Sequence, residues 1–168
     1  MQDEPPTKQL RRSNSGVDNL LLEVCASHNF DIAEMWLHKD KDYRLINSHV
    51  RRSNLDTPTY DELQEVYQEG PSDQIHQLSL SLCKWSKKVG FVLWITEQAT
   101  PRLAQALKYS ISEVKAAVAV PIYHEGVYAT MIYFGLNGST SFVPGAEEDY
   151  LVEMSEKVVR ECLNNRCN

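Results

Sequence analysis

The side chains that most often carry enzyme chemistry are scattered along this sequence. Its five histidines are His28, His38, His49, His76 and His124, and none of them stands in an HExxH motif. The chain also contains no GxSxG, no phosphate-binding glycine loop and no GxGxxG. Without such a motif, no nucleophile can be paired with a base by spacing. We therefore predict no catalytic residue, no cofactor and no independent enzymatic activity.

The cysteines give no sign of a metal or redox site. They are Cys25, Cys83, Cys162 and Cys167, and they form no CxxC pair of the kind that zinc and redox sites use. We expect reduced thiols that serve mostly as small core residues, and we predict no metal site.

Aromatic residues are the positive signal for a binding pocket. Six of them could wall an apolar cavity with a few polar tips: Trp36, Trp85, Trp94, Tyr123, Tyr128 and Tyr133. Ligand sites are commonly lined in this way. Buried aromatic residues also commonly just fill a core. The sequence therefore leaves ligand binding and core packing open for each of the six.

Ser15 is a candidate phosphorylation site. Arg12 precedes it by three positions and Leu10 by five, a spacing that basophilic kinases favour; the alternative is a solvated basic tail. Residues 1–16 hold two prolines, several charges and hardly any apolar side chain. We predict that they form a flexible arm before a single domain at residues 17–168.

The first half of the domain shows one helical and one hairpin pattern. Apolar residues spaced as on one face of a helix predict a helix over residues 17–27. Residues 30–38 and 43–50 are rich in aromatic and branched side chains around a charged turn, which predicts a hairpin. Residues 53–74 are rich in acids, and no Lys or Arg occurs from position 53 to 83. We expect an acidic insertion there, with one helical turn near residues 60–67.

The second half predicts a helix, strands and a long final helix. Residues 75–89 fit both a strand alternation and a helical seam; we favour a helix over residues 80–88, ended by Gly90, and then a short strand. Pro101 marks the start of another helix. Residues 116–123 and 127–136 form a β-hairpin with glycine in its connection, and a helix follows over residues 146–165. The order predicts an α+β fold with an antiparallel sheet.

Alternation along the predicted hairpin separates two faces of the sheet. It groups Tyr123 with Ala117 and Ala119, and Tyr128 and Thr130 likewise oppose Tyr133 on the last strand. The small alanines leave volume that either a packed helix or a ligand must fill. Which face meets the terminal helices stays open.

Three stretches resemble GAF domains. Residues 119–128, AVPIYHEGVY, resemble the family's strand ending in Val-Pro-Ile, short polar turn with glycine, and following apolar strand. Residues 82–95, LCKWSKKVGFVLWI, are similar to its helix, glycine and strand unit. Phe142 followed by residues 146–149 resembles its entry to the last helix. The likeness covers residues 17–163. A narrower one, to plant NIN-like nitrate-responsive transcription factors, involves Val24, Cys25, His28, Ala33 and Trp36.

The resemblance implies a sensor or regulatory module. Its sheet would have about five to six strands, with the terminal helices on one face and short helices over a small-molecule pocket on the other. Terminal helices of the family often pair between subunits, so we expect either a homodimer or helices that cover only their own sheet. The Asn-Lys-Phe-Asp-Glu signature of cyclic-nucleotide binders is absent, residues 96–118 lack the cysteine of bilin binders, and only Cys83 lies near the pocket side. The alternative is a ligand-free protein-interaction module with a phosphorylated arm.

Composition sets the remaining limits. The chain has 168 residues, 42% hydrophobic and 24% charged, which are ordinary values for one globular domain. A net charge of −6 counts against nucleic acid as a partner. Its apolar runs are far shorter than the roughly 20 residues that span a bilayer, and its first residues do not read as a signal peptide. We expect a cytoplasmic or nuclear location, no membrane partner, and an output domain outside this segment.

Overall fold

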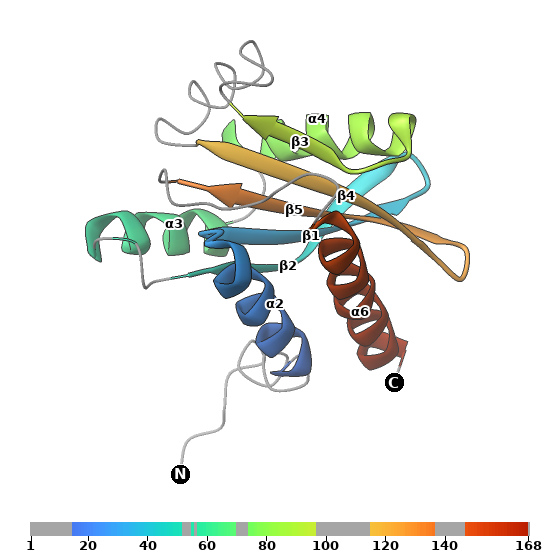
Figure 1. Cartoon of the computed structure of the whole chain (residues 1–168), viewed down its shortest axis with the longest axis horizontal. Coiled ribbons are helices and arrows are strands. Elements are labelled where there is room, and N and C mark those ends of the chain that lie inside the picture. The colour runs from blue at the N-terminus through green and yellow to red at the C-terminus, as the bar shows by residue number, and fades with distance from the viewer. Residues whose placement is uncertain are drawn as a thin grey trace.

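The computed structural model describes residues 15–51, 55, 57–69, 74–96, 115–136 and 147–167. Its elements in chain order are α2 (Ser15–His28), β1 (Ile32–Lys39), β2 (Asp42–Val50), α3 (Thr57–Glu69), α4 (Gln74–Val89), β3 (Leu93–Thr96), β4 (Ala116–His124), β5 (Val127–Gly135) and α6 (Glu148–Cys167) (Figure 1). The predicted α+β fold is confirmed.

The five described strands form one antiparallel sheet in the order β2-β1-β5-β4-β3. Both predicted hairpins are present. The turn between β4 and β5 consists of Glu125 and Gly126, whose φ angles of 49° and 82° give the twist that two-residue hairpins prefer. The two hairpins are joined by the pairing of β1 with β5, which local sequence patterns do not reveal.

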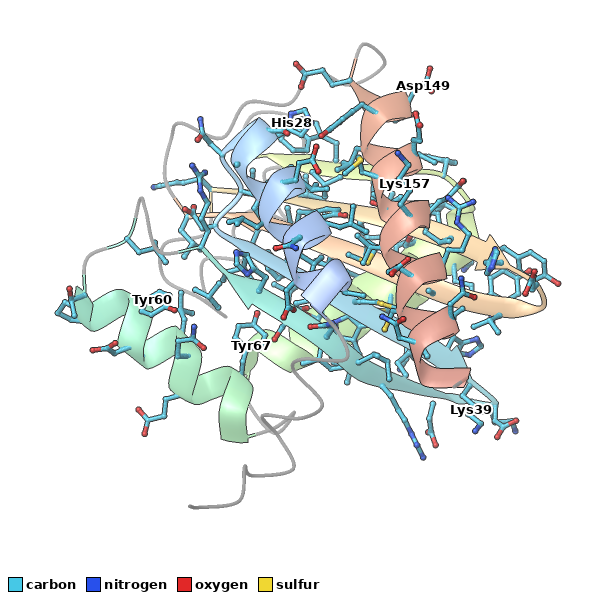
Figure 2. The ribbon with its side chains drawn as sticks, turned by 90° about the horizontal axis from the view of Figure 1, so that it is seen from below. His28, Lys39, Tyr60, Tyr67, Asp149 and Lys157 are labelled. Carbon is cyan, nitrogen blue, oxygen red and sulfur yellow. The ribbon has the colours of Figure 1, made fainter. Side chains whose placement is uncertain are left out.

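Helices cover both faces of the sheet. The terminal helices α2 and α6 contact each other and pack on one face, while α4 packs against β4 and β5 on the other (Figures 1 and 2). Helix α3 lies beside the edge strand β2 and contributes Leu63 to the same core layer as α4. The predicted arrangement, with the terminal helices on one face and further helices on the other, is confirmed, although α4, with 16 residues, is not the short helix that was expected.

Strand alternation assigns the two core layers. Val118, Val120 and Met131 lie under the terminal helices, and Ala117 and Ala119 lie under α4. The small alanine side chains let α4 approach the sheet, and Leu82 and Cys83 of that helix belong to the same layer. The space above the alanines is therefore filled by a helix, one of the two outcomes that the sequence left open.

Two helices are longer than predicted. The acidic stretch holds a helix of 13 residues rather than one turn, because Tyr60, Leu63 and Tyr67 recur at helical spacing and pack toward the sheet. Helix α4 begins at Gln74 rather than at residue 80, since its buried stripe starts in its first half, at Leu78 and Ser79. Gly90, with a φ of 76°, follows its last residue as predicted.

Some predicted features fall outside the described residues. These are residues 1–14 of the arm and the helix expected from Pro101. Helix α2 begins at Ser15, within the predicted arm. Among the described helices, none combines the length and the apolar character needed to cross a bilayer.

Candidate functional site

A buried acid, Glu34, organises the α4 face of the sheet. It lies on β1 and is inaccessible to solvent. Its Oε1 accepts hydrogen bonds from the indole Nε1 of Trp36 at 2.8 Å and from the hydroxyl of Ser79 at 2.6 Å, and its Oε2 accepts one from the hydroxyl of Tyr67 at 2.5 Å. A buried carboxyl group needs such partners. We call these four residues the Glu34 cluster.

Each member of the Glu34 cluster is placed by a regular element. Glu34 and Trp36 are two positions apart on β1 and therefore share a face. Ser79 stands on the buried stripe of α4, and Tyr67 stands in the second half of α3. Figure 2 shows Tyr60 and Tyr67 on the side of α3 toward the sheet. Two of the three bonds therefore tie α3 and α4 to β1, and the third lies within β1.

Cys25, Cys83 and Cys162 are buried and form no disulfide. Burial, assisted by the nearby Glu34, raises the pKa of Cys83, although a hydrogen bond with Thr130 opposes the shift. Burial likewise raises the pKa of Cys25 to about 12. Cys162, on α6, is buried between that helix and the sheet. Protonated, inaccessible thiols are poor nucleophiles, and in the described part of the chain no group of acids, histidines and cysteines could hold a metal ion.

An open cavity of about 120 Å³ lies beyond the Glu34 cluster, where α4 ends over the sheet. A row of four aromatic rings crosses the sheet there. His38 on β1 pairs in register with Tyr43 on β2 and with Tyr128 on β5, and Tyr128 pairs with Tyr123 on β4. Paired residues on one face of a sheet lie close enough for their rings to touch. The ring centroids are 4.5 Å apart for His38 and Tyr43, and 4.6 Å apart for Tyr123 and Tyr128.

Lys87, in the last turn of α4, lies over this aromatic row. Its Nζ is 2.6 Å from Nδ1 of His38 and 4.8 Å from the centroid of the Tyr128 ring. The first distance corresponds to a hydrogen bond, and the second corresponds to a cation–π contact. We call Lys87 and the four aromatic residues, together with Thr130 on the cavity wall, the Lys87 site.

Burial and the charge of Lys87 both favour the neutral form of His38. Desolvation and the Lys87 ammonium lower the pKa of His38, and Asp40 offsets part of the shift. His38 is therefore neutral at pH 7, and its Nδ1 accepts a hydrogen bond from the Lys87 ammonium. Among the described residues, no carboxylate lies within 4.0 Å of the Lys87 ammonium. The Lys87 site thus carries a positive charge in a chain of net charge −6.

A second, more open cavity of about 260 Å³ lies at the edge strand β2. It is lined by Asp18, Ser48, His49, Val50, Tyr60 and Gln64. Burial and the neighbouring Arg51 lower the pKa of His49. This cavity is polar, and it holds none of the six aromatic residues that the sequence singled out.

Those six residues lie on both faces of the sheet. Trp36, Tyr123 and Tyr128 are on the α4 face, but Trp36 is buried in the Glu34 cluster, so only the two tyrosines line the Lys87 site. Tyr133 is buried under α6, where its hydroxyl lies 2.7 Å from that of Ser155. They do not surround one cavity.

Two further candidates lie away from the cavity. Trp94 packs with the terminal-helix layer, and Trp85 on α4 is 38% exposed. For Ser15, the structure describes the backbone but not the side chain. Sequence reasoning missed His38, Tyr43 and Lys87, because only the register of three strand pairs and the position of α4 bring them together.

This architecture is the GAF fold. The GAF domain of a sensor histidine kinase from Bacillus halodurans is similar over 91% of this chain and 95% of its own, with a TM-score of 0.57 and 13% sequence identity. The GAF domain of a phosphoenolpyruvate-protein phosphotransferase from Coxiella burnetii is similar over 92% and 84%, with a TM-score of 0.57 and 12% identity.

The same fold also occurs in an enzyme. The free methionine-R-sulfoxide reductase from Neisseria meningitidis is similar over 92% of this chain and 80% of its own, with a TM-score of 0.55 and 10% identity. No model of a known protein family and no curated protein matches the sequence. The comparisons therefore establish the fold alone.

Removing the hydroxyl of Tyr67 should loosen α3. We expect Tyr67→Phe to lower the free energy of unfolding by about 1 to 3 kcal/mol, since a hydrogen bond to a buried carboxyl group is lost. Urea unfolding measures the change, and hydrogen exchange should show faster opening of α3. Tyr60→Phe is the control on the same helix, because the Tyr60 hydroxyl accepts a hydrogen bond from Gln64 of α3 itself and is not one of the three donors to Glu34 named above. Equal effects of the two variants would contradict the role of the Glu34 cluster.

The contact between Lys87 and His38 should be visible by titration. We expect NMR to give His38 a pKa below 6.5, and Lys87→Met to raise it toward 6.5 because the adjacent charge is removed. Because the folded-state pKa is lowered, the free energy of unfolding should fall as pH drops through 6.5. Lys84→Met, an exposed change on the same helix, should leave the His38 titration unaltered. A His38 pKa that is unchanged in Lys87→Met would rule out the contact between the two residues.

Proposed function

We propose that this chain is a non-enzymatic regulatory domain that senses a small molecule at the Lys87 site. The observation that carries the proposal is the open cavity itself, walled by Tyr43, Tyr123 and Tyr128 with the Lys87 ammonium at its rim. Apolar walls with a few placed polar groups are typical of ligand sites. The closed Glu34 cluster fills the sheet centre beside it, which leaves the end of the sheet as the place for a ligand.

The fold supports a regulatory role. Two of the similar structures are GAF domains taken from a sensor histidine kinase and from a phosphotransferase, so an output domain elsewhere in a longer protein is part of the proposal. A ligand would signal by binding one conformation more tightly than another. Helix α4 is the element through which it would act, since Lys87 and Ser79 connect the cavity and the Glu34 cluster.

Burial of the described thiols supports the non-enzymatic part of the proposal. Cys83, on α4, is enclosed between that helix and the sheet, and burial raises its pKa. Cys25 and Cys162 lie in the layer under the terminal helices, on the opposite face from the Lys87 site. A reductase that works through thiolates needs sulfur atoms that reach its substrate. The described residues offer none at the cavity.

The alternative function is that of a protein-interaction module. It is favoured by exposed aromatic rings, namely Phe91 at 63% and Tyr123 at 62%, because clustered exposed apolar groups mark interaction surfaces. Phosphorylation of Ser15 would add charge at the start of α2, where a helix favours anions. Under this alternative, a ligand screen finds nothing, and Tyr123→Ser weakens capture of the partner.

We also propose a homodimer through the terminal helices. Leu22 on α2 is 48% exposed although it is a large apolar residue, and α2 and α6 lie next to each other, where a second pair could join them in a bundle. We expect sedimentation equilibrium to give a dimer that Leu22→Arg converts to monomer. Phe91→Arg, an equally polar change at an exposed position outside these helices, should leave the dimer intact. A monomer at all concentrations would remove this proposal.

Ligand binding should depend on the wall of the cavity. We expect a screen of compounds of up to about ten heavy atoms by ligand-observed NMR to yield binders, which suits a cavity of about 120 Å³. Tyr128→Ala should weaken those binders by about tenfold or more, since it removes an aromatic wall. The matched change Tyr150→Ala, on α6, should not. An empty screen, or equal loss in both variants, would contradict the proposed function.

A further inference from the structure

The position of Lys87 on α4 is unlike that of its neighbouring lysines. Lys84 and Lys88 are exposed to solvent, whereas Lys87 is half-buried. Its ammonium group contacts a neutral imidazole and an aromatic ring instead of an acid. Withdrawing a charge from water is unfavourable unless a partner compensates it. Neither the imidazole nor the ring carries the opposite charge, so the positive charge of the site remains uncompensated.

The surrounding groups do not change this charge balance. Asp40, the acid that raises the pKa of His38, lies in the exposed turn between β1 and β2. Its effect on His38 is smaller than that of Lys87. The phenols of Tyr43, Tyr123 and Tyr128 are neutral at pH 7. The described walls of the cavity therefore present one cation and no anion.

The cavity also limits the size and shape of its occupant. A volume of about 120 Å³ is close to the roughly 150 Å³ of a protein cavity known to take up benzene. Tyrosine rings and Pro121 line its sides and would contact an apolar body. The ring face of Tyr128 would otherwise suit a ligand cation, but Lys87 already occupies it.

We propose that the Lys87 site binds a small organic anion, with a carboxylate against the Lys87 ammonium and an apolar body, no larger than one ring, between the tyrosines. This inference rests on the proposed function and names its ligand class. A carboxylate supplies the charge that the site lacks and forms a charge-assisted hydrogen bond stronger than the one to a neutral imidazole. The bound anion would compete with His38 for the Lys87 protons.

The test compares three single-ring probes that differ in charge. Benzoate, neutral benzamide and cationic benzylamine are titrated into the full chain, with the shifts of the His38 ring and of the tyrosine rings followed by NMR. We expect benzoate to bind at least about tenfold more tightly than benzamide, as one added charge contact of moderate strength would give. Benzylamine should bind most weakly. Acetate, as a second anion without a ring, should bind more weakly than benzoate.

Variants assign the preference to Lys87. Lys87→Met should remove the advantage of benzoate over benzamide while leaving benzamide binding within about twofold, and Lys87→Gln guards against a folding defect in the first variant. Lys84→Met, on the same helix, should behave as the unaltered chain. Benzoate should also raise the pKa of His38, because it partly neutralises the charge that lowers it.

The outcomes separate this inference from the proposed function. Equal binding of benzoate and benzamide, or no saturable binding of either benzoate or acetate, overturns the anion assignment. Preference for benzylamine does the same. If uncharged compounds still bind in a manner that Tyr128→Ala weakens, the sensor function stands with another ligand class. If no compound of any charge binds, both proposals fail.

Discussion

The α4 face of the sheet depends on one constraint, which is that the buried carboxyl group of Glu34 must be hydrogen-bonded. Its donors come from three elements, β1, α3 and α4. Losing one of these donors would leave the buried carboxyl group less well hydrogen-bonded, at a cost of about 1 to 3 kcal/mol. The two helices are thereby held at one position and one rotation above the sheet. The position of Lys87 over the aromatic row follows from the way α4 is oriented there.

Contacts between α4 and β1 recur at matching distances along the two elements. Four helical residues rise by about 6.0 Å and two strand residues by about 6.6 Å, so the two elements stay in step. Ser79 contacts Glu34, and Lys87, two turns on, contacts His38, which is four residues along β1 from Glu34. Between them, Cys83 contacts Thr130, whose paired residue on β1 is Trp36. The contact between Lys87 and His38 is thus the third in a row of contacts between α4 and the sheet, and the row begins at the Glu34 cluster.

This row of contacts shows how much of the fold and of the site could be predicted from the sequence. The hairpins, the terminal helices and Gly90 were predictable because alternation, helical periodicity and turn residues act over a few positions. Helix α3 was underestimated since its acidic composition concealed a stripe of three residues. The contact between His38 and Lys87 joins residues 49 positions apart. Aromatic residue types suggested a cavity, and alternation along β5 placed Tyr128 and Tyr133 on opposite faces, but only the register between strands brings Tyr128 beside His38 and Tyr123.

Strand β5 also connects the two faces of the sheet. Strand β5 carries Tyr128 and Thr130 on the wall of the cavity, and Met131 and Tyr133 in the layer under α6. Tyr133 is bonded to Ser155 of α6 and stacks on Phe30, directly after α2, with centroids 5.2 Å apart. Because packed layers respond to a shift by changing discrete contacts, a ligand that displaced β5 would be felt at both terminal helices. A sensor built on this fold therefore needs no contact between its ligand and the helices that would pass the signal on.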